Sequence, residues 1–93
     1  MKKGVTGLIP DLEKKRKEID QTDQRLLNLL NQRIRLVSEA IAIKKEMGEK
    51  IRNTRREKEI LEKLKLKNKG PLKEEELEKI FHAIMRMCRN SLE

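Results

Sequence analysis

Three cationic side chains stand at positions where a packed helix should be apolar. When residues 11–47 are written as heptads, the two seam positions are mostly aliphatic, but Arg16, Arg33 and Lys44 fall on them. At ~100° per residue, Arg33 and Lys44 point within about 20° of each other on one helix face. Burying an unpaired cation costs several kcal/mol, and Asp23 is the only acid on this seam. The pattern therefore favours an anionic ligand held between helices.

A second group of cations falls at the start of the next predicted helix, in the run Arg52-Asn53-Thr54-Arg55-Arg56-Glu57. A cation in the first turn opposes the helix dipole unless an anion lies nearby. Asn53 can act as N-cap, and Thr54 with Glu57 forms a capping box, so these residues are suited to capping as well as to binding. Seam cations can also extend to solvent or fix helix register. Spacing alone does not decide between these structural roles and the binding of a ligand.

The other reactive side chains do not assemble into a catalytic group. His82 has no partner at nucleophile–base spacing, and Cys88 lies on the apolar side of a predicted helix, where a packing role is expected. The sequence has no Gly-rich phosphate loop and no zinc-ligand spacing. Covalent, metal and cofactor chemistry are therefore not expected. A single cysteine cannot form an internal disulfide and fits a cytoplasmic protein.

The elements that position these residues are predicted to be helices alone. Gly and Pro occur at few places, and Leu and Ile recur at spacings of three and four, which predicts an all-α chain of one long and two shorter helices. The long helix is expected over residues 11–47, directly after Pro10, with Gly48 ending it. The second is expected from Asn53 or Thr54, and the third from Glu74. The apolar face of the third helix is expected to contain Leu77, Ile80, Phe81, Ile84, Met85 and Cys88. Residues 1–10 are expected to be a flexible segment ahead of one helical domain, residues 11–93.

The predicted first helix is too long for a compact monomer of this size. At ~1.5 Å per residue it would extend about 55 Å, whereas a 93-residue globule has a radius of gyration of ~12 Å. Its ends need a partner, and a second copy of the same chain is the simplest one. We therefore expect an intertwined homodimer with the long helices packed across a two-fold axis.

Composition limits the partners further. The chain has 24 Lys and Arg against 16 Asp and Glu, a formal net charge of +8, with Phe81 as its one aromatic residue. That charge is compatible with nucleic acid or with a small polycarboxylate. Because the cations of interest lie on an inner seam, which a duplex cannot reach, nucleic acid is not expected. The N-terminus has no apolar run of signal-peptide length, and no membrane association is expected.

The order and spacing of these residues resemble the all-helical class of chorismate mutases over about residues 12–92. The stretches that carry the resemblance are Arg16-Lys17-Glu18-Ile19-Asp20-x-x-Asp23, Leu26-Leu27-x-Leu29-Leu30-Asn31-x-Arg33, Ile43-Lys44-Lys45 and Ile51-Arg52-Asn53-x-Arg55-Arg56-Glu57. The resemblance implies an intertwined homodimer of three-helix chains. It also implies the pericyclic rearrangement of chorismate to prephenate, on the route to phenylalanine and tyrosine, with no cofactor, metal or covalent intermediate.

The resemblance also implies a role for each cation. Arg16 is similar to the arginine that reaches into the partner subunit's site, and Arg33 and Arg56 are similar to the other carboxylate binders. Lys44 is similar to the lysine that donates to the ether oxygen and to a carboxylate. Glu57 resembles the glutamate that accepts a hydrogen bond from the ring hydroxyl. Guanidinium groups suit the two carboxylates of a dianion.

At three further substrate-binding positions the chain departs from the family pattern. Asn53 replaces a frequent Asp, and Cys88 replaces a frequent Ser. Leu92 falls where the family usually has a Gln or Glu that hydrogen-bonds the ether oxygen, which leucine cannot do. Glu93 is one residue away. Weak activity is one expected consequence of this departure.

Two other functions are compatible with the sequence. A relative within the same family cleaves isochorismate to pyruvate and salicylate in a similar site, and sequence does not decide between the two isomeric substrates. A non-catalytic helical module for dimerisation, regulation or nucleic-acid binding is the alternative from another functional class.

Overall fold

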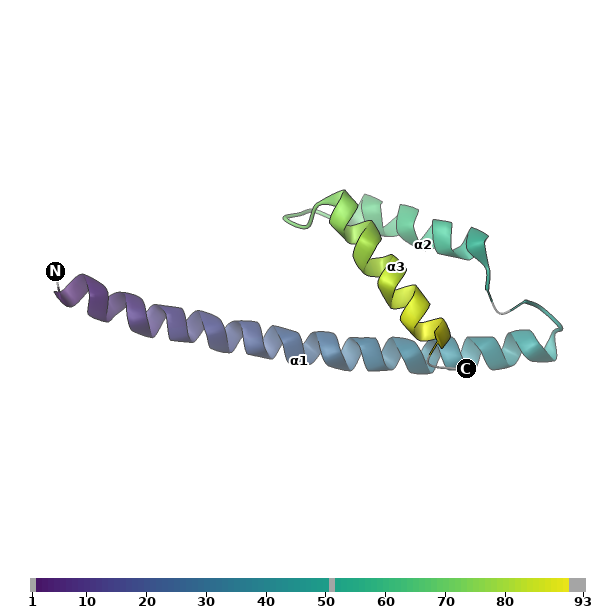
Figure 1. The fold of residues 1–93 in the computed structure, drawn as a ribbon, viewed down its shortest axis with the longest axis horizontal. Coiled ribbons are helices and arrows are strands. Elements are labelled where there is room, and N and C mark those ends of the chain that lie inside the picture. The colour runs from purple at the N-terminus through teal and green to yellow at the C-terminus, as the bar shows by residue number, and fades with distance from the viewer. Residues whose placement is uncertain (1, 51, 91–93) are drawn as a thin grey trace. The chain divides into compact units, whose positions relative to one another are not determined.

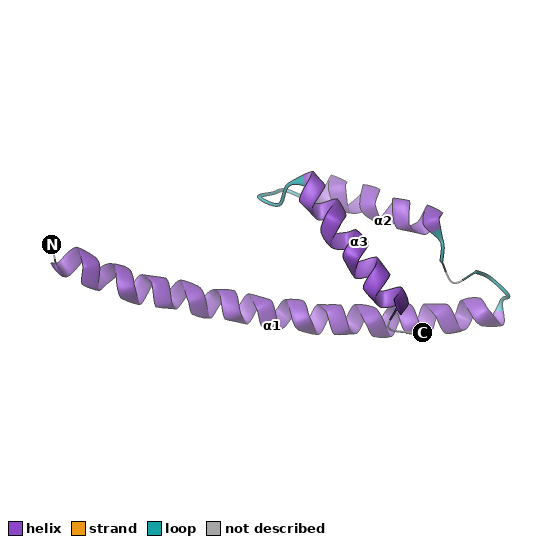
Figure 2. Ribbon diagram, in the orientation of Figure 1, coloured by secondary structure: helices purple, strands orange, loops and turns teal. Residues whose placement is uncertain are grey.

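The computed structural model describes residues 2–50 and 52–90, and these residues form three helices joined by loops (Figures 1 and 2). The helices are α1 (Lys2–Glu46), α2 (Thr54–Lys67) and α3 (Glu74–Asn90). The described residues include no strand, and none of their helices is long and apolar enough to cross a bilayer. The predicted all-α chain with one long and two shorter helices is therefore confirmed.

The start of α1 corrects one prediction. We expected this helix to begin near Asp11, but it begins at Lys2 and contains Pro10. A proline inside a helix removes one backbone hydrogen bond and costs roughly 3 kcal/mol, which disfavours the helix without forbidding it. Pro10 was expected to precede the helix, whereas the helix continues through it. The separate, flexible segment 1–10 stays a prediction.

The end of α1 follows the prediction that Gly48 terminates it. Gly48 has φ +75°, a left-handed conformation that suits a residue without a Cβ. Its N–H donates to the Lys45 carbonyl at 3.2 Å, and the Glu49 N–H donates to the Lys44 carbonyl at 2.8 Å. These two bonds form a Schellman motif, which satisfies carbonyls that the helix end would leave unpaired.

The chain divides within α1 into two compact units, residues 1–32 and 33–93. In the first unit the predicted seam residues Leu12, Ile19 and Leu26 are more than half exposed. The second unit contains the end of α1 together with α2 and α3. The cations that the sequence singled out are therefore divided between the two units, with Arg16 in the first.

Asn53 is the N-cap of α2, which resolves the uncertainty between Asn53 and Thr54. Its backbone is extended (φ −125°, ψ 97°), and its side-chain oxygen accepts from the Arg56 N–H at 3.0 Å. The Glu57 N–H donates to the Asn53 carbonyl at 3.1 Å and closes the first turn. The cap thus fixes the starting register of the helix that carries Arg56 and Glu57.

The core of the second unit lies between α2 and α3. Its buried members are Leu61, Leu77 and Met85, and Ile60, Leu64 and Phe81 pack against them. The predicted apolar stripes of both helices therefore meet each other. Ile80 was expected in this buried face but is 44% exposed. The reason is angular, because at ~100° per residue Ile80 lies at the edge of the stripe, beyond the surface that α2 covers.

An ion pair also joins α2 to α3. The Lys65 ammonium contacts the Glu78 carboxylate and lies 3.9 Å from that of Glu74. The hydrogen bond to Glu78 raises the pKa of Lys65, and the same bond lowers the pKa of Glu78. The depressed Glu78 pKa contributes stability above its unfolded value of 4.5, and this is lost as the pH falls through the folded value. The raised Lys65 pKa contributes stability below 10.5, and this is lost as the pH rises beyond it.

We therefore expect Lys65→Met to lower Tm at pH 7 by about 1 to 3 °C, a modest effect because both groups are partly solvated. The difference from wild type should shrink when the pH is lowered below the Glu78 pKa. Thermal unfolding followed by circular dichroism across this range measures it. Lys63→Met removes an exposed lysine from the same helix as a control. A deficit for Lys65→Met that is equal at pH 7 and in acid would contradict the assigned ion pair.

Candidate active site

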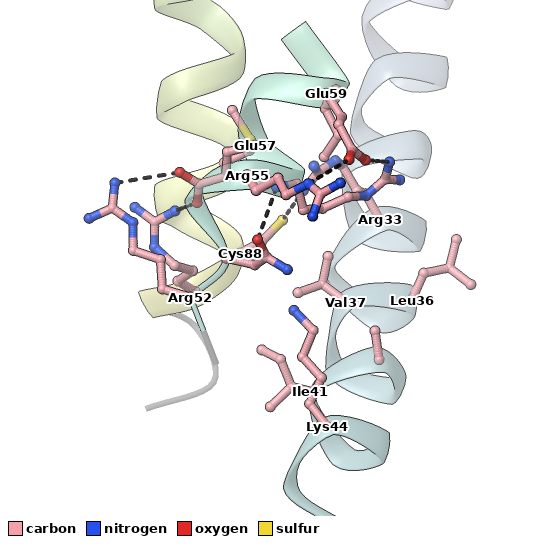
Figure 3. A pocket seen from close by; sticks show the side chains of 16 residues that line it. Arg33, Leu36, Val37, Ile41, Lys44, Arg52, Arg55, Glu57, Glu59 and Cys88 are labelled. Atoms are coloured by element: carbon pink, nitrogen blue, oxygen red, sulfur yellow. Dashed lines mark hydrogen bonds and ion pairs between the residues drawn. The ribbon is translucent and has the colours of Figure 1, made fainter. Parts of the chain in front are cut away.

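A cavity of about 630 Å³ lies within the second unit, between the last turns of α1, the start of α2 and the end of α3 (Figure 3). Its lining is strongly cationic, with two carboxylates, Glu57 and Glu59, to balance six basic side chains. The six are Arg33, Lys44, Arg52, Arg55, Arg56 and Arg89. This imbalance suits a ligand that brings negative charge of its own.

Arg33 and Lys44 line the cavity from the same side of α1. Both are half-buried, and Val37 and Ile41 line the cavity between them. Figure 3 shows the Lys44 side chain rising from α1 toward the space in front of Val37. The shared direction of the two cations is the one expected from their spacing. Half-buried cations beside apolar side chains lie in a lower effective dielectric, where their attraction for an anion is stronger than in water.

Cys88 is the most deeply buried side chain that lines the cavity. It is 1% exposed, and the Arg33 Nη1 atom donates toward its sulfur at 3.1 Å. The predicted packing role of Cys88 on the apolar side of α3 is confirmed by this burial. Through this contact α3 also helps to fix the guanidinium of Arg33 within the cavity.

Glu57 is held by arginines from two other segments. Its Oε1 accepts from Arg52 Nη2 at 3.4 Å, and its Oε2 accepts from Arg89 Nη1 in an ion pair. Arg52 precedes α2, whereas Arg89 lies in the last turn of α3. The carboxylate therefore bridges the start of one helix and the end of another.

Glu59 makes a second pair of contacts, nearly two turns along α2 from the Asn53 cap. It lies 3.7 Å from the guanidinium groups of both Arg55 and Arg56. The Arg56 side chain is 55% exposed, so this contact is easily exchanged for another anion. Asn53 caps α2 and also lines the same cavity, while its role in binding stays a prediction.

Among the described residues, Arg16 and His82 were singled out from the sequence but are not lining residues of this cavity. Arg16 is exposed and lies in the unit of residues 1–32. Leu92 lies outside the described residues. His82 is exposed and is not a lining residue.

Sequence reasoning missed Arg89 altogether. On the third helix the sequence singled out His82 and Cys88, and Arg89 directly follows Cys88 at the edge of the apolar stripe. The available signal was a cation at the edge of a predicted buried helix face. Its ion pair with Glu57 depends on how α3 packs against α2, and spacing within one helix does not supply that information.

Comparison with known proteins shows which family this chain resembles. The family model for chorismate mutase type II matches residues 15–92, which include every lining residue of the cavity. The chain belongs to this family. Two solved chorismate mutase structures from Thermus thermophilus are similar to it, at TM-scores of 0.83 and 0.81. They are 33% and 34% identical in sequence, over 85% and 83% of this chain and 90% and 96% of theirs.

One relative of this chain, also a chorismate mutase by its name, is a longer protein. It is the bifunctional chorismate mutase/prephenate dehydratase of Aquifex aeolicus, 37% identical over 82 residues. The match covers 84% of this chain and 23% of the relative, so the chain spans about a quarter of that protein's length. The identification of the all-helical chorismate mutase class from the sequence is therefore confirmed.

Proposed function

We propose that this chain is a chorismate mutase, an isomerase that rearranges chorismate to prephenate on the route to phenylalanine and tyrosine. The observation that carries the proposal is the cationic cavity with Arg33 and Lys44 half-buried on one side of its wall. A dianionic substrate would balance the excess of six basic over two acidic side chains in the lining. Family membership supports the mutase over the isochorismate lyase and the non-catalytic module.

The reaction is a unimolecular pericyclic shift, in which one C–O bond breaks as one C–C bond forms. It needs no nucleophile and no cofactor. The protein has two tasks, which are to hold the flexible enolpyruvyl ether in its compact form and to stabilise charge on the ether oxygen. A shaped cavity lined by fixed donors is suited to both tasks.

The lining cations divide these tasks. Arg33 and Arg56 bind the substrate carboxylates through their guanidinium groups. Arg56 exchanges its weak contact with Glu59 for the ligand, whereas Arg33 is already held by Cys88. Lys44 donates to the ether oxygen as the C–O bond breaks.

The remaining contacts orient the ring. Glu57 accepts a hydrogen bond from the ring hydroxyl, and Asn53 and Cys88 complete the wall around the substrate. Leu92 is assigned to the position beside the ether oxygen by family resemblance alone. We propose no metal or cofactor for the site.

Each site is completed by a second copy of the chain, which contributes Arg16. The exposed seam of Leu12, Ile19 and Leu26 supports this homodimer, because one chain leaves these apolar side chains open to water. A biosynthetic enzyme of small soluble metabolites suits the cytoplasm, which is the location we propose.

The direct test is to follow the loss of chorismate absorbance and to identify the product. Turnover above the uncatalysed rate, with prephenate as product, is expected. Formation of pyruvate and salicylate from isochorismate, with no reaction of chorismate, would point to the lyase. No turnover of either compound would reject the enzyme.

Binding supplies a second test. A bicyclic dicarboxylate shaped like the transition state should raise Tm by roughly 10 °C when its concentration is 100 times its Kd. The reason is that it binds the folded state and not the unfolded state. An acyclic dicarboxylate of equal charge should change Tm much less, since charge without shape does not fill the cavity. Equal shifts with the two compounds would contradict a shaped site for this substrate.

A further inference from the structure

The Glu57 carboxylate is restrained more closely than capping of α2 requires. Asn53 already caps the helix, and the Glu57 backbone is fixed by its bond to the Asn53 carbonyl. The side chain is nevertheless held by Arg89 on one oxygen and by Arg52 on the other. Figure 3 shows Glu57 and Arg52 at this end of the cavity. A capping side chain needs neither contact, so the two arginines serve the carboxylate itself.

Arg89 is the stronger of these two restraints. The side chains of Arg89 and Glu57 are 23% and 16% exposed, whereas that of Arg52 is 61% exposed. A charge-assisted hydrogen bond between two largely buried groups is less screened than one at the surface. Arg52 is therefore a supporting contact, and Arg89 sets the direction of the carboxylate.

We propose that Arg89 is a positioning residue that aims Glu57 at the ring hydroxyl of chorismate. The inference rests on the function proposed above. An ionised carboxylate offers about four acceptor directions, and the arginines occupy one on each oxygen, which leaves acceptor capacity toward the cavity. Without Arg89, the three rotatable bonds of Glu57 spread the carboxylate over several rotamers.

A purely structural role for Arg89 predicts different behaviour. In that case the residue would only tie the end of α3 to the start of α2, and its loss would lower stability and affect all substrates alike. A positioning role acts through Glu57 and through the hydroxyl that Glu57 accepts from. The two roles separate when either Glu57 or the hydroxyl is removed.

The first measurement compares Arg89→Met with Arg89→Lys and with Arg86→Met. Arg86 is an exposed arginine of the same helix that does not line the cavity. Arg89→Met should lower kcat/KM by about tenfold, because one oriented hydrogen bond to a charged group is lost in part. Arg89→Lys should restore part of this loss, and Arg86→Met should leave kcat/KM unchanged. Tm is recorded for each variant, so that loss of folding is separated from loss of orientation.

The second measurement removes what Arg89 is proposed to act upon. In a Glu57→Ala background, Arg89→Met should cause no further loss of kcat/KM. With a chorismate analogue that has hydrogen in place of the ring hydroxyl, Arg89→Met should likewise match wild type. A tenfold penalty that persists in either case would overturn the positioning role while leaving the enzyme in place. A wild-type chain without mutase activity would overturn both the role and the proposed function.

Discussion

Lys44→Ala is expected to lower kcat by about 10²- to 10³-fold, which is the usual loss for a donor aimed at developing charge. Lys44 is half-buried in the cavity wall, where its ammonium is less hydrated than at the surface. Negative charge on the ether oxygen grows as the C–O bond breaks, so this donor stabilises the transition state more than the bound substrate. The loss should therefore appear in kcat more than in KM.

The matched control is Lys45→Ala, which removes the neighbouring lysine. Lys45 is exposed and does not line the cavity, so its loss should leave kcat unchanged within about twofold. Size-exclusion chromatography should show the same oligomeric state for both variants and wild type. Near-normal turnover by Lys44→Ala would remove this residue from the mechanism, and equal losses in both variants would indicate a general effect of positive charge.

The helix boundaries that could be predicted are those set by local chemistry. Asn53 caps α2 through its own side chain, and Gly48 ends α1 because it adopts a left-handed conformation. Both effects act within a few residues, so the sequence contains all the information they need. The start of α1 at Lys2 was not predictable in this way, because it depends on a helix tolerating Pro10.

The candidate site was predictable where one helix sets the geometry. Arg33 and Lys44 share a face because their spacing is close to whole helical turns, and both line the cavity as that spacing indicates. The contact of Arg89 with Glu57 joins residues that are 32 positions apart on two helices. It depends on how α3 packs against α2, a relation that periodicity within either helix does not encode.

Mixing two inactive variants is expected to restore activity, if Arg16 and Lys44 of one site come from different chains. Arg16 lies in the unit of residues 1–32, whereas Lys44 lines the cavity of the other unit. In an intertwined dimer, a protomer with Arg16→Ala pairs with one carrying Lys44→Ala. One site then receives both substitutions and the other receives neither. Each variant alone should be nearly inactive, because every site in its dimer has lost one essential cation.

The recovered activity has an expected size. When the two variants are unfolded together and refolded at equal concentration, about half of the dimers are mixed and half of their sites are intact, which gives about a quarter of wild-type activity. Arg33→Ala mixed with Lys44→Ala is the matched control, since both residues line the cavity of one chain. Every site of that mixed dimer keeps one defect, so no recovery is expected. Recovery in both mixtures, or in neither, would contradict a site that borrows Arg16 from its partner.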